Sequence, residues 1–274
     1  MSATIKRATL AALAFLLCGS GHAFADSFGS PNFAIYGISG LTINDSLNET
    51  TVCVSGNAGS GGTFSLDKCL VQGNIYVTAA GNLVLGSHGA FTGSEIIGSL
   101  TSVNNALTSE AASLWALSPT LTINGTVTSG MTFAPGVILT NGNVDLNQQV
   151  FTLSGSGQFI FNITGTVTFS CSDLVLAGGA TTGNVIFNIQ SSGTSTWNKD
   201  CTSWNGTILA PTGNVIVHNA WPFGDFSGQV FGNTVDLHSA GSIVQPTEVP
   251  EPSSLALLVT GLLGIAGAAR RKRN

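Results

Sequence analysis

The chain carries very little charge, and this scarcity argues against several classes of protein. Charged residues make up 8% of its 274 residues, and only 8 residues are Lys or Arg. So few cations argue against a nucleic-acid-binding protein, whose affinity comes largely from contacts to phosphate. The 43% hydrophobic fraction argues against intrinsic disorder, and glycine without a period of three excludes collagen.

The few basic residues lie almost entirely at the two ends of the chain. Lys6 and Arg7 are near the N-terminus, and four more occupy positions 270–273. The span 26–252 contains 2 basic and 13 acidic residues, so its formal net charge is −11. We therefore interpret the ends as targeting segments and the acidic middle as the working domain.

Residues 1–25 have the pattern of a secretory signal peptide. The basic pair Lys6-Arg7 precedes an apolar run, 8–17, that is too short to span a bilayer. Ala23-Phe24-Ala25 is a small-x-small cleavage pattern. We expect an exported mature chain that starts at Asp26.

Residues 246–274 contain three parts in a fixed order. A short motif comes first, the uncharged run 253–269 follows as an expected membrane helix, and a basic end stops the span on the cytoplasmic side. In a helix, this run would reach roughly 25 Å. The motif is Val249, Pro250, Glu251 and Pro252, and the basic end is Arg270, Arg271, Lys272 and Arg273.

This ordered set of three segments closely resembles the PEP-CTERM sorting signal of Gram-negative bacteria that make exopolysaccharide. The resemblance implies processing near the motif by exosortase, a membrane transpeptidase-like enzyme. It also implies an inner-membrane intermediate, followed by the cell surface or the extracellular matrix. A plain single-span membrane anchor is the alternative.

Four cysteines remain once Cys18 leaves with the signal peptide. An even number in an exported chain predicts disulfides. Of the three possible pairings we favour Cys53–Cys69 and Cys171–Cys201, because each closes a modest local loop. The sequence has no Cys-x-x-Cys and no calcium-loop repeat, so we expect no metal site and no cofactor.

Residues 26–245 show the same local sequence pattern throughout, and we expect a single all-β domain. Short β-type runs follow repeated Gly-Asn pairs, which can turn the chain into the next strand. One interval, from Gly213 to Gly232, fits one coil of a β-solenoid. We predict a right-handed β-solenoid because the turn residues repeat and the strands are very short, with a β-sandwich as the alternative. The pairs begin at Gly73, Gly81, Gly142, Gly183, Gly213 and Gly232.

One segment, 103–117, has helical rather than β periodicity. Its apolar residues fall on one helical face, and we expect that face to pack along the wall of the solenoid. Ser102 is the expected N-cap, and Pro119 follows the end. The apolar residues are Val103, Leu107, Ala111, Leu114 and Leu117.

A second resemblance rests on the succession of the segments 184–189, 206–211 and 228–232. It resembles the choice-of-anchor A domain, a bacterial surface module that carries interchangeable sorting signals. It is also similar to the ice-binding-like adhesin fold, a discontinuous right-handed β-helix with one long helix beside it. Residues 132–137 match one step of that fold. The resemblance implies a solenoid but assigns no ligand.

Catalysis is not expected from this sequence. It has no Gly-x-Ser-x-Gly elbow of the hydrolase type, and we predict no catalytic residues. His218 and His238 lie one coil apart, which predicts a stacked surface pair. A carbohydrate-cleaving β-helix with paired carboxylates is the third-ranked function, its candidates being Asp173, Asp225 and Asp236.

Two sets of residues are candidates for a ligand face. Threonines two residues apart on a strand share one face, and stacked pairs could make a flat, charge-free surface that orders water. Clustered tryptophans could instead stack on sugars. The alternatives are outward-facing threonines without a ligand and tryptophans that plug the core. The candidates are Thr166, Thr168, Thr194, Thr196, Trp197, Trp204 and Trp221.

Together these features predict an exported, non-enzymatic surface protein with a structural or adhesive role in contact with exopolysaccharide. Ice binding is the alternative function.

Overall fold

The computed structural model of the chain describes residues 32–45, 51–125, 127, 130–198, 204–219, 226–239 and 243–244. These residues form strands of 2–16 residues and one α-helix, and residues 25–247 make one compact unit. The elements are β1 (Phe33–Asn44), β2 (Thr51–Ser55), β3 (Asn57–Ser60), β4 (Thr63–Asp67), β5 (Cys69–Gln72), β6 (Ile75–Val77), β7 (Leu83–Leu85), β8 (Ala90–Phe91), β9 (Glu95–Ile97), α3 (Thr101–Trp115), β10 (Leu121–Asn124), β11 (Thr132–Phe133), β12 (Gly136–Asn141), β13 (Val144–Asn147), β14 (Val150–Ser154), β15 (Phe159–Ile163), β16 (Val167–Ser170), β17 (Asp173–Ala177), the 3-10 turn η1 (Thr182–Asn184), β18 (Val185–Ile189), β19 (Thr194–Asn198), β20 (Trp204–Asn219), β21 (Phe226–Ser239) and β22 (Ile243–Val244).

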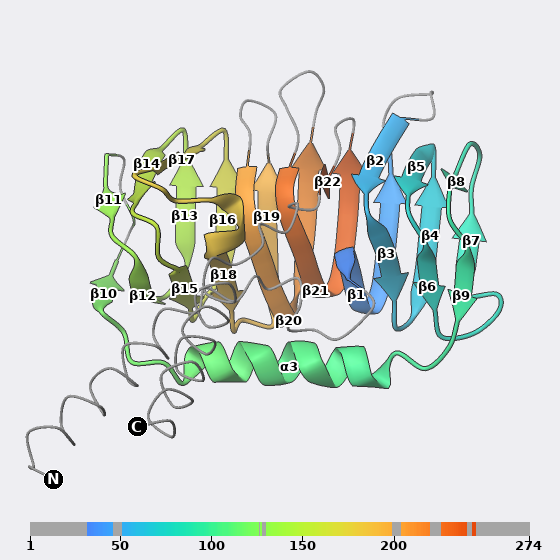
Figure 1. The fold of residues 1–274 in the computed structure, drawn as a ribbon, viewed down its shortest axis with the longest axis horizontal. Coiled ribbons are helices and arrows are strands. Elements are labelled where there is room, and N and C mark those ends of the chain that lie inside the picture. The colour runs from blue at the N-terminus through green and yellow to red at the C-terminus, as the bar shows by residue number, and fades with distance from the viewer. Residues whose placement is uncertain are drawn as a thin grey trace, which may run out of the picture. The chain divides into compact units, whose positions relative to one another are not determined.

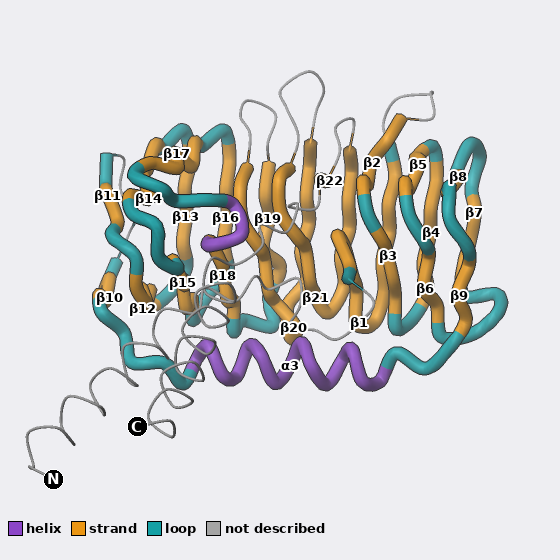
Figure 2. The backbone as a smooth tube through the Cα atoms, viewed as in Figure 1, coloured by secondary structure: helices purple, strands orange, loops and turns teal. Residues whose placement is uncertain are grey.

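The strands wind into a β-solenoid in which every described pairing is parallel (Figure 2). One long side has the order β10, β12, β15, β18, β20, β21, β1, β3, β6 and β9. A second long side is built the same way. Shorter strands, including β11–β14–β17 and β22–β2–β5–β8, form the rest of the wall. The predicted solenoid is confirmed, and the β-sandwich alternative is wrong.

The solenoid is discontinuous because its first strand lies in the middle of the stack. Strand β1 pairs with β21 on one edge, where Ile35 lies opposite Val230, and with β3 and β4 on the other. The coils from β2 to β9 build outward to one end, and helix α3 then carries the chain back along the stack to β10 (Figure 1). Its 15 residues reach about 22 Å, which spans four or five strand spacings.

Helix α3 packs on the wall of the solenoid through the predicted apolar face. Val103, Leu107 and Leu114 are buried, and the helix lies against β15, β18 and β20. The predicted start is wrong: Leu100 precedes the helix, and no side chain caps it, so Ser102 lies inside the first turn. Leu117 lies beyond the last turn and is exposed.

Stacked apolar residues fill the inside of the coils. The rings of Phe161 and Phe187 stack with centroids 4.8 Å apart and planes at 3°. These two residues are directly opposite on β15 and β18, so the solenoid register itself aligns the rings. Such ladders make each coil depend on its neighbours for burial.

The targeting segments fall outside the described residues. These are the expected signal peptide, 1–25, and the expected sorting signal, 246–274, with its motif, membrane helix and basic end. Within the described ranges, no helix is long and apolar enough to cross a membrane.

Candidate functional site

The second long side of the solenoid, which we call the outer face, is built from eight strands. Their order is β13, β16, β19, β20, β21, β1, β4 and β7. Strand alternation sends successive side chains to opposite sides of the sheet. On β16, for example, Val167 and Phe169 are buried while Thr168 between them is exposed.

The four candidate threonines come together on this face. Thr168 on β16 lies opposite Thr196 on β19. Thr166 and Thr194 stand two residues before them, on the same side of their coils, because strand side chains alternate. We call these four residues the threonine patch. Thr168 and Thr194 are exposed, and the other two are half-buried.

The spacing within the threonine patch follows from β geometry. Neighbouring strands lie about 4.8 Å apart, and residues i and i+2 on one strand lie roughly 6.6 Å apart. The backbone fixes both distances. The patch is therefore a small, regular array of hydroxyl and methyl groups.

Sequence reasoning missed the residues that continue this array. Asn214 on β20 lies opposite Thr194, and Thr234 on β21 lies opposite Asn214 and donates a hydrogen bond to its Oδ1 at 2.7 Å. Thr42 and Ser65, on β1 and β4, extend the row that contains Thr168. None of these residues belongs to a Thr-x-Thr pair, so only the coil register reveals them.

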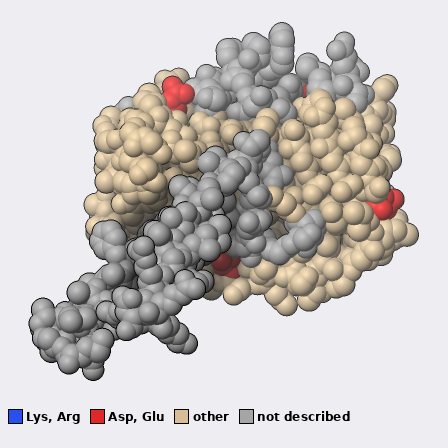
Figure 3. Space-filling view, in the orientation of Figure 1, with Lys and Arg blue, Asp and Glu red and all other residues tan. Residues whose placement is uncertain are grey.

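Acidic residues limit the uncharged part of the outer face. Asp145 on β13 lies opposite Thr168, and Asp236 on β21 stands on the same row beyond Ile216. The uncharged strip thus covers β16, β19 and β20 in this row. Elsewhere charge is sparse: on the side drawn in Figure 3, the described surface carries only isolated acidic groups.

The structure contradicts a surface role for two of the three candidate tryptophans. Trp197 and Trp204 are both 0% exposed. Trp197 follows Thr196 by one residue and therefore points inward, and Trp204 packs edge-on against Phe169 at 4.5 Å. Both indoles plug the core, and Trp221 lies outside the described residues.

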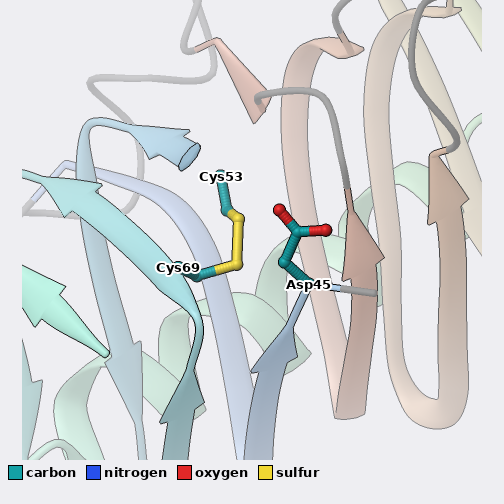
Figure 4. A group of neighbouring side chains, drawn as sticks. All are labelled: Asp45, Cys53 and Cys69. Atoms are coloured by element: carbon teal, nitrogen blue, oxygen red, sulfur yellow. A yellow bond between two sulfur atoms is a disulfide. The ribbon is translucent and has the colours of Figure 1, made fainter. Parts of the chain in front are cut away.

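The predicted disulfide between Cys53 and Cys69 is confirmed. It joins β2 to β5 and lies beside the buried carboxylate of Asp45 (Figure 4). These three side chains are close enough to resemble a metal site, but bonded sulfurs are not thiolate ligands. Cys171 is also disulfide-bonded. Its predicted partner, Cys201, lies outside the described residues, so that pairing stays a prediction.

The predicted histidine pair is present on the outer face. His218 on β20 and His238 on β21 are opposite each other, and their rings stack with centroids 5.0 Å apart and planes at 10°. His238 Nε2 also lies 3.1 Å from Asp236 Oδ2. Of the other carboxylates considered for sugar cleavage, Asp173 lies on β17, away from this row, and Asp225 lies outside the described residues. The two described candidates, Asp173 and Asp236, therefore lie on different parts of the solenoid wall.

Comparison with known proteins gives two matches along the sequence. The profile of the ice-binding-like family matches residues 47–242, and the PEP-CTERM protein-sorting motif matches residues 248–273. No match is found among curated protein sequences.

Solved structures of ice-binding proteins share the fold. One from the Antarctic ascomycete Antarctomyces psychrotrophicus is 21% identical, with a TM-score of 0.54, covering 85% of this chain and 98% of its own. A domain of ice-binding protein 1 from Shewanella frigidimarina is 16% identical, with a TM-score of 0.53 and coverages of 84% and 98%. An ice-binding protein from an Arctic yeast is 17% identical, with a TM-score of 0.52 and coverages of 81% and 93%.

Proposed function

The chain belongs to the ice-binding-like family, and from this premise we propose that it is an ice-binding protein displayed at the cell surface. The PEP-CTERM motif marks it as an exosortase-sorted protein of a Gram-negative bacterium. We assign ice contact to the threonine patch, and we infer a binding rather than a catalytic role.

The observation that carries the proposal is the register of Thr168 with Thr196 on the outer face. It supports an array of hydroxyls with two fixed spacings, held by a rigid backbone. The regular spacing of water molecules in ice can match the spacings of such an array. A flexible ligand could bind without regularly spaced hydroxyls. The row of Asn214 and Thr234 supports the same function, because it adds polar, uncharged groups beside the patch.

Contact with exopolysaccharide stays a prediction, as does membership of the choice-of-anchor A group. The glycan hypothesis rested on exposed indoles, and the burial of Trp197 and Trp204 removes two of its three candidates. Its remaining support is the sorting motif, which implies export to the cell surface. We therefore rank ice binding first.

The experiment uses the oxidised mature chain and measures inhibition of ice recrystallisation together with ice-crystal shaping. Two variants, Thr168→Asp and Thr196→Asp, each place a charge in the threonine patch. The matched control is Thr122→Asp, because Thr122 is an exposed strand threonine on β10, outside the outer face.

We expect faceted crystals and inhibition at micromolar wild-type protein. Both patch variants should lose most of that activity, and the control should keep it. Inactive wild-type protein would overturn the ice-binding proposal. Patch variants that remain as active as the wild type would overturn the assignment to this surface.

A further inference from the structure

We propose that His218 and His238 bind one divalent transition-metal ion on the outer face, with Asp236 as the carboxylate that orients His238. The inference is independent of ice binding. It starts from the register of β20 and β21, which places the two imidazoles directly opposite each other at the same end of adjacent parallel strands.

The chemistry of the pair suits such an ion. Neutral imidazole nitrogen is a preferred ligand for Zn²⁺, Ni²⁺ and Cu²⁺. The contact between Asp236 Oδ2 and His238 Nε2, at 3.1 Å, favours the tautomer that carries its proton on Nε2. Nδ1 of His238 then keeps its lone pair, which is the usual arrangement of a carboxylate, a histidine and a metal.

The geometry needs only a small adjustment of side chains. Two nitrogens bound to one ion at 2.0–2.1 Å lie about 3 Å apart. The rings are now parallel with centroids 5.0 Å apart, so His218 must turn about its side-chain torsions to direct a nitrogen toward the ion. The terminal torsion of a histidine has a broad energy well, and both side chains are half-buried rather than packed in the core.

The surroundings favour a cation. Asn44 on β1 lies opposite His238, and the Oδ1 atoms of Asn44 and Asp236 are buried without a hydrogen-bond partner in the described part of the chain. The acidic body of the protein adds long-range attraction for positive ions. Among the described residues, only the group of Asp45 and the bonded cysteines brings three ligand atoms together. The histidine site therefore supplies two protein ligands and leaves the other positions to water.

Titration of the mature chain with Zn²⁺ or Ni²⁺ tests the site. The chain must carry no histidine tag, and binding is followed by calorimetry and by the NMR signals of the imidazole groups. We expect one ion per chain. The variants His218→Ala and His238→Ala should each weaken binding at least tenfold, and Asp236→Asn should weaken it by about 10–100-fold.

A third histidine provides the matched control. His88 lies between β7 and β8 with φ of 65°, and Asn tolerates that backbone conformation, so His88→Asn should fold and bind as the wild type does. Thermal unfolding without metal checks that every variant is folded. Binding that is absent from the wild type, or that survives unchanged in folded His218→Ala and His238→Ala, would overturn the proposal.

Discussion

Asn188 donates a hydrogen bond from Nδ2 to Asn162 Oδ1 at 2.8 Å, and both amides also reach helix α3. Asn162 Nδ2 donates to the carbonyl of Leu114, and Asn188 Nδ2 to that of Ala111. Both carbonyls lie near the end of the helix, and that of Leu114 also accepts from the backbone amide of Leu117 at 3.3 Å. Two neighbouring coils therefore provide partners near the C-terminal end of α3, and this pair fixes the helix on the wall.

Replacing one of these asparagines should destabilise the domain. We expect Asn188→Ala to lower the free energy of unfolding by about 1–3 kcal/mol, because it leaves buried polar groups without partners. Urea unfolding followed by circular dichroism measures the change. The exposed Asn147→Ala on β13 is the control and should stay within about 0.5 kcal/mol of the wild type. An equal loss in both variants would contradict the role of the pair.

Tyr36 should make the protein less stable in alkali. Burial raises the pKa of its phenol, which donates a hydrogen bond to Asn104 Oδ1 at 2.6 Å. The folded protein therefore holds this proton more tightly than the unfolded chain, whose tyrosine pKa is about 10. The contribution is complete below that pH and is lost as the pH rises above it.

Unfolding measured between about pH 8 and pH 11 tests this statement. Tyr36→Phe should lose about 1 kcal/mol at neutral pH, through its hydrogen bond, and should show a flatter decline in alkali. An identical alkaline decline in Tyr36→Phe and wild type would assign the loss to other groups.

Trp204 should behave as a core residue rather than as a sugar platform. Trp204→Ala removes a fully buried side chain that packs against Phe169, Phe187 and Phe226, and should cost about 3–5 kcal/mol of stability. Trp204→Phe keeps an aromatic ring and should cost clearly less. Denaturant titration separates the two. A stable Trp204→Ala protein that had lost glycan binding would reverse this conclusion.

The Cys53–Cys69 disulfide should stabilise the coils beyond β1. A loop of this length, with a sequence separation of 16, contributes about 3 kcal/mol in the chain-entropy description. The paired variant Cys53→Ser/Cys69→Ser should therefore melt at a lower temperature. Chemical reduction would be a poorer test, because Cys171 is also disulfide-bonded. An unchanged melting temperature would show that packing alone holds these coils.

Asp145 should limit the proposed ice-binding surface. Asp145→Thr extends the uncharged row by one strand beside Thr168, and we expect stronger inhibition of ice recrystallisation with stability within about 0.5 kcal/mol of the wild type. Asp173→Thr on β17 removes the same charge away from the outer face and is the control. Equal gains in both variants would point to net charge instead of the surface.

Short-range sequence patterns predict more of the fold than of the candidate site. The repeated Gly-Asn turns and the single helical segment were enough to predict a solenoid with one helix, since both features are local in sequence. The threonine pairs were visible as i and i+2 spacings. Thr42, which is far from them in sequence, enters the same row only because β1 inserts beside β21.

The sequence leaves open whether Trp197 lies on the surface or in the core. Whether Trp197 points inward depends on the face that Thr196 occupies, and the composition of the segment does not specify it. The interval between His218 and His238 did predict their stack, because it equals one coil. The contact of His238 with Asp236 depends on side-chain conformation, which the interval does not specify.

The insertion of β1 between β21 and β3 has a consequence for secretion. A chain that is exported from its N-terminus delivers β1 first, yet this sheet cannot close until β21 has emerged. Such long-range closure is slow compared with local coil formation. The sorting motif at 249–252 follows β21 almost immediately in the chain. Completion of the fold and delivery of the sorting motif therefore fall within the same last stage of export.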